Sequence, residues 1–209
     1  MIKHLSLLTL VFLLSTNSQA KKNPGFYINK DGDTVYVKFN VAVSLFRQEA
    51  KIDRIQEKIR FYDSLNNTHY LKPEHASEVV IISSEDTIRM LSRANNLGLG
   101  SFLSRNGIFL RLIKDGKLKL FKYYESKSSA PGYNHSTNTM SGGYTYETQC
   151  FVLQKDNEPL FRTMNPVSFG KDMANYLSEC PELVIKIEQK QYQKNDVPLI
   201  VDEYNKKCR

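Results

Sequence analysis

Two apolar runs meet at Lys114-Asp115-Gly116 within residues 108–124 (IFLRLIKDGKLKLFKYY), and this pattern predicts a β-hairpin. A three-residue turn, with Gly116 in the left-handed conformation, pairs Leu112 with Leu118. A two-residue turn would mix polar and apolar side chains on both faces, and register decides which side chains are buried. The three-residue turn therefore predicts one shared apolar face, formed by Ile108, Leu110, Leu112, Leu118 and Leu120.

Residues 26–39 (FYINKDGDTVYVKF) predict a second hairpin around the same Lys-Asp-Gly triplet. Here a two-residue Asp31-Gly32 turn separates the two faces more cleanly. The expected apolar face consists of Phe26, Ile28, Val35, Val37 and Phe39, and the expected outer face of Tyr27, Asn29, Thr34, Tyr36 and Lys38. Asp31-Gly32-Asp33 lacks the further oxygen ligands and the closing glutamate of a calcium loop, so a plain turn is expected.

The remaining segments predict more strands and then a change of period. Strands are expected in residues 58–62 and 79–82, and in a last hairpin formed by 144–154 and 160–164. Residues 84–93 alternate and are expected to pair with 79–82, and a helix is the alternative because Ser84-Glu85-Asp86 resembles a helix start. The polar residues 125–143 predict a long mobile loop. After residue 165 the apolar period becomes helical, with Ser168, Pro181 and Asp196 suited to three helix starts.

These elements indicate an α+β fold, in which antiparallel β-hairpins form a sheet or a small barrel and a bundle of about three short helices follows. The expected organisation is a signal peptide in residues 1–20, a β-rich domain in 21–164 and a C-terminal helical segment in 165–209 that packs on it.

Residues 1–20 have the composition of a secretory signal peptide. Lys3 lies in a short charged head, residues 5–14 are nearly all apolar, and Ser18-Gln19-Ala20 ends the stretch with small residues where signal peptidase cleaves. The apolar run is shorter than the roughly 20 residues that cross a bilayer. A buried helix of the folded domain is the alternative interpretation. We expect a secreted or periplasmic protein, cleaved after Ala20, whose mature chain has no transmembrane segment.

Three cysteines, Cys150, Cys180 and Cys208, lie in the mature chain, and outside the cytoplasm pairs of thiols tend to oxidise. Cys180 and Cys208 flank a helical segment, and closing that loop would stabilise the chain by about 3–4 kcal/mol on the chain-entropy model. Cys150 lies in an expected strand, where a buried thiol is predicted. A nucleophilic role is the alternative, but no Cys-His signature surrounds Cys150.

The formal net charge of +7 falls to +6 when Lys3 leaves with the signal peptide. Basic residues between Lys114 and Lys122 alternate with apolar ones, as on the solvated face of a strand. Such dispersed charge, in an exported protein, argues against nucleic acid as a partner. Weak attraction to an anionic envelope polymer or to lipid headgroups is an alternative that the basic surplus leaves open.

The sequence offers few catalytic residues. His69, His75 and His135 lie in separate segments, and neither His-Glu-x-x-His nor Cys-x-x-Cys occurs, so a zinc site is not expected. A Gly-x-Ser-x-Gly elbow is also missing, and the glycine-rich residues 97–101 lack the lysine and spacing of a phosphate-binding loop. Two carboxylates could converge as a glycosidase pair, but no pattern selects them. We expect no cofactor and assign no catalytic residue.

Three segments resemble a group of small exported proteins of Gram-negative bacteria: GFYINKDGDTVYVKF, FLRLIKDGKLKLFKYYE, and LSECPELVIKIEQKQY with LIVDEYNKKC. Members share a strand-turn-strand with Gly-Asp-Thr, a glycine-centred hairpin that ends in Leu/Phe-Lys-Tyr, and a final Asp/Glu-Cys-Pro followed by Tyr-Asn and Cys. The resemblance covers most of the mature chain. It implies secretion and a disulfide between Cys180 and Cys208. It carries over no catalytic residue, because the group has no assigned activity.

Two functions remain as hypotheses. The first is a non-catalytic, envelope-associated module that binds an envelope protein or an anionic polymer through a sheet face lined by Tyr and Lys. Its expected surface consists of Tyr27, Tyr36, Lys38, Lys119 and Phe121, with Tyr133, His135 and Tyr144 placed to touch a ligand from the loop and its end. The alternative is a hydrolase with a site beneath residues 125–143, which requires a deep pocket holding at least two convergent ionisable groups.

Overall fold

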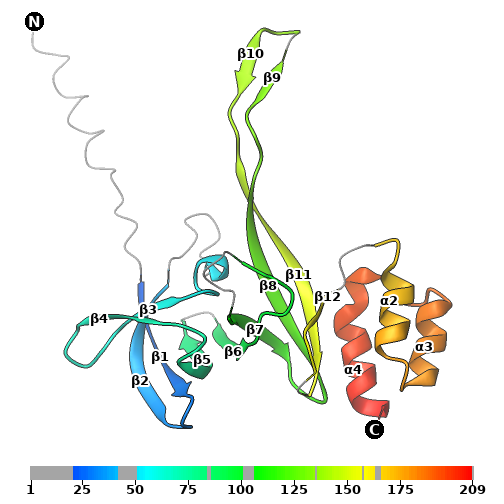
Figure 1. Cartoon of the computed structure of the whole chain (residues 1–209), viewed down its shortest axis with the longest axis horizontal. Coiled ribbons are helices and arrows are strands. Elements are labelled where there is room, and N and C mark those ends of the chain that lie inside the picture. Colours follow the sequence, from blue (N-terminus) through cyan, green and yellow to red (C-terminus); the bar gives the residue numbers. More distant parts are fainter. Residues whose placement is uncertain are drawn as a thin grey trace, which may run out of the picture.

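The computed structural model shows an antiparallel β-sheet with a bundle of helices at one end and an arm that projects from two strands near the same end (Figure 1). The structure describes residues 21–41, 51–83, 86–100, 106–134, 136–156, 158–162 and 166–208. The expected signal peptide lies outside these residues. No helix of the described ranges combines the length and the apolar character that crossing a membrane requires.

Ten strands form one open sheet in the order β12-β11-β8-β7-β6-β5-β1-β2-β3-β4. They are β1 (Lys21–Asn29), β2 (Thr34–Val41), β3 (Ile59–Tyr62), β4 (Thr68–Leu71), β5 (Ala76–Ile82), β6 (Thr87–Arg93), β7 (Ile108–Lys114), β8 (Leu118–Ser128), β11 (Thr145–Lys155) and β12 (Phe161–Arg162). The α+β prediction is confirmed. The small-barrel alternative is wrong, because β4 and β12 end the sheet and do not pair with each other.

The hairpin of β1 and β2 is present, but its register differs by one residue from the predicted one. Phe26 pairs with Tyr36, so residues 30–32 form a three-residue turn instead of a two-residue turn. Gly32 ends this turn with φ at +94°, a conformation that glycine adopts without steric cost. A shift of one residue exchanges the faces of β1 relative to β2. Tyr27 therefore lies on the core side, where Phe26 was expected, and Phe26 lies on the outer side.

The hairpin of β7 and β8 also has a register that differs from the predicted one. Leu112 pairs with Phe121, and a bulge follows before the turn. Gly116 has the positive φ that the turn was predicted to need, at +154°. The pairing is displaced by an odd number of residues, so Leu118 and Leu120 face the side of the sheet opposite to Leu112. The predicted single apolar face is therefore wrong, and the sheet is buried on both sides here.

Helices α2 (Phe169–Tyr176), α3 (Pro181–Glu188) and α4 (Val197–Lys207) cover one side of the sheet at its β8–β11 end (Figure 1). Their apolar residues pack on three sheet residues, Leu118, Leu120 and Leu153, which are at most 1% exposed. Burial of each such leucine contributes about 1.5–3 kcal/mol. The opposite side of the same strands packs on Leu99, which lies in the loop after β6. The helical segment is thus held on the sheet by a continuous apolar core.

The three helices predicted after residue 165 are confirmed. Ser168 and Asp196 occupy the N-cap positions of α2 and α4, and Pro181 begins α3. The predicted disulfide is also present: Cys180 and Cys208 have Cα atoms 5.5 Å apart, and their bond links the start of α3 to the end of α4. The bond thereby closes a loop that contains α3 and α4.

Residues 125–143 do not form the predicted loop. β8 and β11 continue beyond the sheet as a two-stranded arm, and β9 (Gly132–Asn134) pairs with β10 (Thr139–Ser141) at its tip (Figure 1). The pairing of β8 with β11 runs from Leu118 opposite Lys155 to Ser128 opposite Thr145. The residues that were expected to cover a pocket therefore pair with each other and project away from the body of the protein.

Candidate binding surface

The outer face of β1–β4 carries alternating aromatic and basic side chains. The pairing of β2 with β3 places Lys38 beside Tyr62, and the pairing of β3 with β4 places Arg60 beside Tyr70. Tyr36 is 79% exposed and Tyr70 is 56% exposed, which is unusual for large aromatic side chains on a sheet. We call this surface the aromatic–basic face, and it consists of Lys22, Phe26, Tyr36, Lys38, Lys58, Arg60, Tyr62 and Tyr70.

Three cations lie over rings of the aromatic–basic face. Lys22 Nζ is 4.1 Å from the ring centroid of Tyr62, and Arg60 Cζ approaches the same ring at 5.6 Å. Lys58 Nζ is 5.2 Å from the ring centroid of Tyr70. Each contact of this kind stabilises an exposed site by about 0.5–1 kcal/mol. A ring, unlike a carboxylate, holds a cation in place without compensating its charge, so the face remains able to attract an anion.

A hollow of about 490 Å³ opens on this face. Phe26 and Tyr36, whose rings are 5.8 Å apart, form part of its wall together with Lys38. Ile82, which is 46% exposed, adds an apolar patch from β5. A volume of this size lies within the range of small-ligand sites. The hollow therefore combines ring surface, an apolar patch and at least one cation.

Among the described residues that line this hollow, Asp63 is the only carboxylate. Its Oδ2 lies 2.9 Å from His69 Nε2, and Asn67 donates to both of its oxygens. The hydrogen bond from His69 is the main cause that lowers the pKa of Asp63, to about 2. Asp63 is therefore held by its own neighbours as an ionised hydrogen-bond acceptor.

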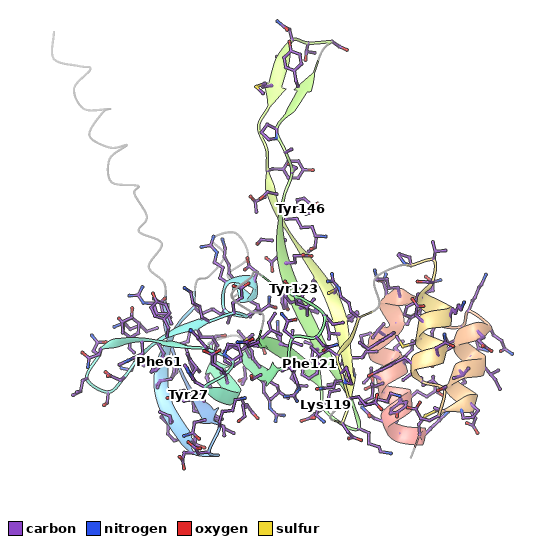
Figure 2. The ribbon with its side chains drawn as sticks, viewed as in Figure 1. Tyr27, Phe61, Lys119, Phe121, Tyr123 and Tyr146 are labelled. Atoms are coloured by element: carbon purple, nitrogen blue, oxygen red, sulfur yellow. A yellow bond between two sulfur atoms is a disulfide. The ribbon has the colours of Figure 1, made fainter. Side chains whose placement is uncertain are left out.

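Only part of the predicted binding surface lies together. Tyr36 and Lys38 belong to the aromatic–basic face, as expected. Tyr27 lies on the opposite side, where its ring is 5.7 Å from that of Phe61 (Figure 2). The cause is the one-residue register shift of β1 relative to the predicted pairing.

The prediction for Phe121 was wrong, because this side chain is completely buried. Lys119 is half-buried, and its Nζ donates to the carbonyl oxygen of Gly116 at 3.0 Å. Figure 2 shows both residues in the half of the sheet next to the helices, away from the aromatic–basic face. The odd displacement of β8 explains the error, since it exchanges the two sides of that strand.

Sequence reasoning missed Phe26, Arg60, Tyr62 and Tyr70. The alternation Arg60-Phe61-Tyr62 was a usable signal, because it places a cation and a ring on the side opposite to an apolar residue. The side of the sheet that Arg60 and Tyr62 face could be assigned only once the residue paired with Phe61 was known. Phe39 supplies that partner, since it lies opposite Phe61 and is completely buried.

The arm carries a second group of exposed aromatic side chains. Tyr133 is 49% exposed and Tyr144 is 67% exposed, and the ring of Tyr144 lies 5.7 Å from that of Tyr146. His135 lies outside the described residues. The arm extends β8 and β11, near the β12 edge of the sheet, whereas β1–β4 lie toward the opposite edge (Figure 1). The structure therefore does not bring these tyrosines to the aromatic–basic face.

The described residues contain no group of three or more His, Cys, Asp or Glu side chains that could hold a metal ion. The carboxyl groups of Asp63 and Glu203 have pKa values lowered to about 2, opposite to the shift that a catalytic proton donor needs. Burial raises the pKa of the free Cys150 thiol, which makes it a weaker nucleophile.

No family model, curated protein or solved structure matches the chain. The physical properties of its surfaces are therefore the basis for the function proposed below.

Proposed function

We propose that the protein is a non-catalytic binding module of the cell envelope and that its aromatic–basic face binds an anionic polysaccharide. The observation that supports this most directly is the alternation of tyrosines with ring-held cations on one face, beside a hollow that Tyr36, Lys38 and Tyr62 line. The apolar faces of sugar rings pack on aromatic side chains, which offer large rigid surfaces. The carboxylate or phosphate groups of the polymer pair with Lys38 and the neighbouring cations.

Export supports the same function. A leader in residues 1–20 sends the chain out of the cytoplasm, where envelope polymers are found. The disulfide between Cys180 and Cys208 agrees with an oxidising compartment. Fractionation of cells and mass spectrometry of the mature protein test this part: we expect a periplasmic or secreted chain that begins at Lys21. An intact leader on a cytoplasmic protein would contradict it.

Affinity electrophoresis of residues 21–209 through gels that contain polygalacturonate tests the polymer. We expect retardation by polygalacturonate and little by neutral dextran, with weaker binding as salt rises, because exposed charges are screened. Tyr36→Ala and Lys38→Ala should each weaken binding about fivefold, since a ring stack or an exposed ion pair contributes about 1 kcal/mol. Lys206→Ala, which removes an exposed lysine of α4, is the matched control and should leave binding unchanged.

Equal retardation in dextran, or no effect of either substitution on the aromatic–basic face, would contradict the proposal. A loss of binding in Lys206→Ala equal to that in Lys38→Ala would point to net charge alone instead of this surface.

A further inference from the structure

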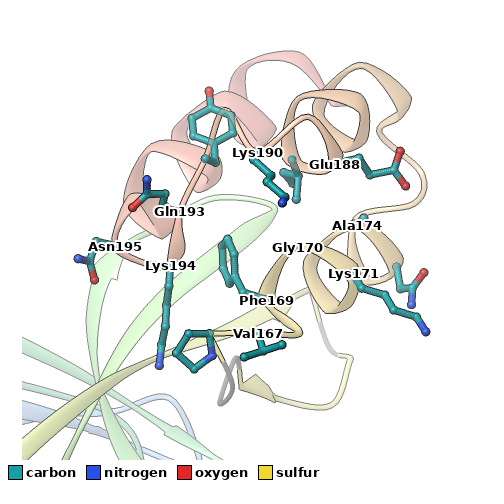
Figure 3. A pocket seen from close by; sticks show the side chains of 14 residues that line it. Val167, Phe169, Gly170, Lys171, Ala174, Glu188, Lys190, Gln193, Lys194 and Asn195 are labelled. Carbon is teal, nitrogen blue, oxygen red and sulfur yellow. The ribbon is translucent and has the colours of Figure 1, made fainter.

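A groove of about 840 Å³ crosses the helical segment between α2, the end of α3 and η4 (Lys194–Asp196) (Figure 3). Phe169, Ala174 and Ile187 contribute apolar atoms to its lining, although each is largely buried. Val167 adds a side chain that is 93% exposed. The groove therefore presents a strip of apolar surface, which an apolar side chain of a partner would cover favourably.

The rim of this groove is basic. Among the described residues, three lysines and one carboxylate, that of Glu188, are the charged side chains that line it, which leaves a surplus of two positive charges. Lys171 and Lys194 lie at opposite ends in Figure 3, and Lys190 extends over the groove between them. The amide groups of Asn175 and Asn195 are also in the lining. Cations are thus distributed along the length of the groove.

Three other lysines near the helices are paired with carboxylates. Lys186 and Lys207 donate to Glu203 at 2.6 and 2.8 Å, and Lys155 lies 2.9 Å from Glu179. Within the described part of the chain, neither Lys171 nor Lys190 forms such an ion pair. The positive charges of Lys171 and Lys190 are therefore available to a ligand.

Lys190 occupies a backbone position that normally belongs to glycine. Its N–H donates to the carbonyl of Ile187 and the N–H of Gln191 donates to that of Lys186, each at 3.0 Å, which is the Schellman motif that ends a helix. The motif requires the left-handed conformation, and Lys190 has φ at +58°. A side chain with a Cβ is strained there. The strained residue is the one that places an ammonium group over the middle of the groove, as expected at a functional site.

We propose that this groove binds an extended acidic peptide of a partner protein, with an apolar side chain against Phe169 and carboxylates at Lys171, Lys190 and Lys194. Cations at both ends and in the middle require a ligand that repeats its negative charge along its length. A fatty acid carries a single carboxylate and would meet only one of them. The amides of Asn175 and Asn195 can hydrogen bond to a peptide backbone. This surface and its partner are distinct from the polysaccharide face, and neither proposal depends on the other.

Fluorescence anisotropy with the mature protein tests the groove. The probe is a labelled hexapeptide with two central leucines flanked by glutamates, and its counterpart has glutamines in place of the glutamates. We expect the acidic peptide to bind and the glutamine peptide to bind at least about tenfold more weakly. Lys190→Gly should weaken the acidic peptide about fivefold. Lys206→Gly, on an exposed site of α4, is the control for a lost lysine and should leave binding unchanged.

Lys190→Gly also separates binding from folding. Glycine suits the left-handed position, so this variant should melt about 2 °C higher than the parent protein while it binds more weakly. A protein that is more stable and binds less well cannot owe the loss to unfolding. The proposal fails if the acidic peptide does not bind, if both peptides bind equally, or if Lys190→Gly leaves binding unchanged. Binding of decanoate without binding of the acidic peptide would replace it with a lipid site.

Discussion

The side-chain amide of Asn205 in α4 forms two hydrogen bonds with the backbone of Leu118, the first residue of β8. Its Oδ1 accepts from the N–H of Leu118 and its Nδ2 donates to the carbonyl oxygen, both at 2.9 Å. Gly116 in the adjoining turn provides the space, because a Cβ at that position would lie 2.6 Å from Asn205 Nδ2. One amide fitted against one turn thus fixes the helices to the central hairpin.

Asn205→Ala should lower the free energy of unfolding by about 1–3 kcal/mol, because both backbone groups of Leu118 lose their partner. Gly116→Ala should destabilise the protein by a similar amount, since its Cβ would displace the same amide. Urea unfolding measures both effects. Asn195→Ala, at an exposed position, is the control and should change stability by less than about 0.5 kcal/mol. If Asn205→Ala leaves the free energy of unfolding unchanged, the apolar core alone holds the helices on the sheet.

Reduction of the disulfide between Cys180 and Cys208 should destabilise the helical segment. The bond closes a loop with a sequence separation of 28 residues, and its chain-entropy contribution is about 3–4 kcal/mol. The double variant Cys180→Ala, Cys208→Ala should therefore unfold at lower urea, and the parent protein should approach it in dithiothreitol. Cys150→Ala is the control, because its thiol is free, and it should keep its sensitivity to dithiothreitol.

The carboxylate of Glu203 joins three groups of the helical segment. Lys186 Nζ donates to its Oε1 at 2.6 Å, Lys207 Nζ donates to the same oxygen at 2.8 Å, and the Tyr192 hydroxyl donates to Oε2 at 2.5 Å. These hydrogen bonds, that of Lys186 first, lower the pKa of Glu203 from 4.5 to about 2. A lowered pKa in the folded state means that the contribution of Glu203 is present above about pH 4.5 and is lost as the pH falls toward 2.

Glu203→Gln should therefore cost about 1–2 kcal/mol at pH 7, where the charged partners lose their carboxylate. The difference in unfolding free energy between the parent protein and the variant should shrink as the pH is lowered from 5 to 2. Glu188→Gln, at an exposed site, should show no such trend. A difference that stays constant over this pH range would mean that these neighbours do not lower the pKa of Glu203 in the folded protein.

Local features were predictable from the sequence, because neighbouring residues encode them. The glycine positions of the turns and the three helix starts follow from short patterns of this kind. The cysteine pair was expected from the resemblance and from its position on either side of a helical segment. The strand registers do not. In the first hairpin, Asn29 Oδ1 accepts hydrogen bonds from the backbone N–H groups of Asp31 and Asp33, which favours the three-residue turn. The alternation of polar and apolar residues alone takes no account of these two hydrogen bonds.

The central register depends on contacts distant in the sequence, and this explains the error over Phe121. Its strand is buried on both sides: Leu120 packs under the helices, and Phe121 packs with Val152 on the opposite side. A strand of this kind has no polar face from which its orientation can be read. The candidate surface was therefore only half predicted, because Tyr36 and Lys38 lie on it and the residues of β3 and β4 were not assigned to it.

Gln56 forms hydrogen bonds with the backbone of both β7 and β8. Its side chain donates to the carbonyl of Tyr124 at 2.7 Å and accepts from the N–H of the same residue at 2.9 Å. Its own carbonyl accepts from the N–H of Phe109 at 2.8 Å. Gln56 is 2% exposed, so the groups it pairs have little access to water. Gln56 thus pairs backbone groups of β7 and β8 at the end of the hairpin far from its turn. It lies 68 residues before Tyr124 in the sequence.

Gln56→Leu should cost about 2–4 kcal/mol, because the change leaves two backbone groups of Tyr124 unpaired in the interior. Thermal and urea unfolding measure this loss. Arg54→Leu is the neighbouring control at an exposed position and should have little effect. Equal stability of Gln56→Leu and the parent protein would mean that water replaces the side chain between the strands.

The tip of the arm should be dispensable for folding. The N–H of Ser129 donates to the carbonyl of Tyr144 at 2.9 Å, which makes this pair suitable to be closed by a two-residue turn. Replacement of residues 130–143 by Asn-Gly would remove β9 and β10 and keep the rest of the arm. The melting temperature should change by less than about 2 °C, because the tip pairs with itself and its described side chains are exposed. Retardation by polygalacturonate should also persist, since the aromatic–basic face is untouched, whereas a loss of binding without a loss of stability would move the polymer site to the arm.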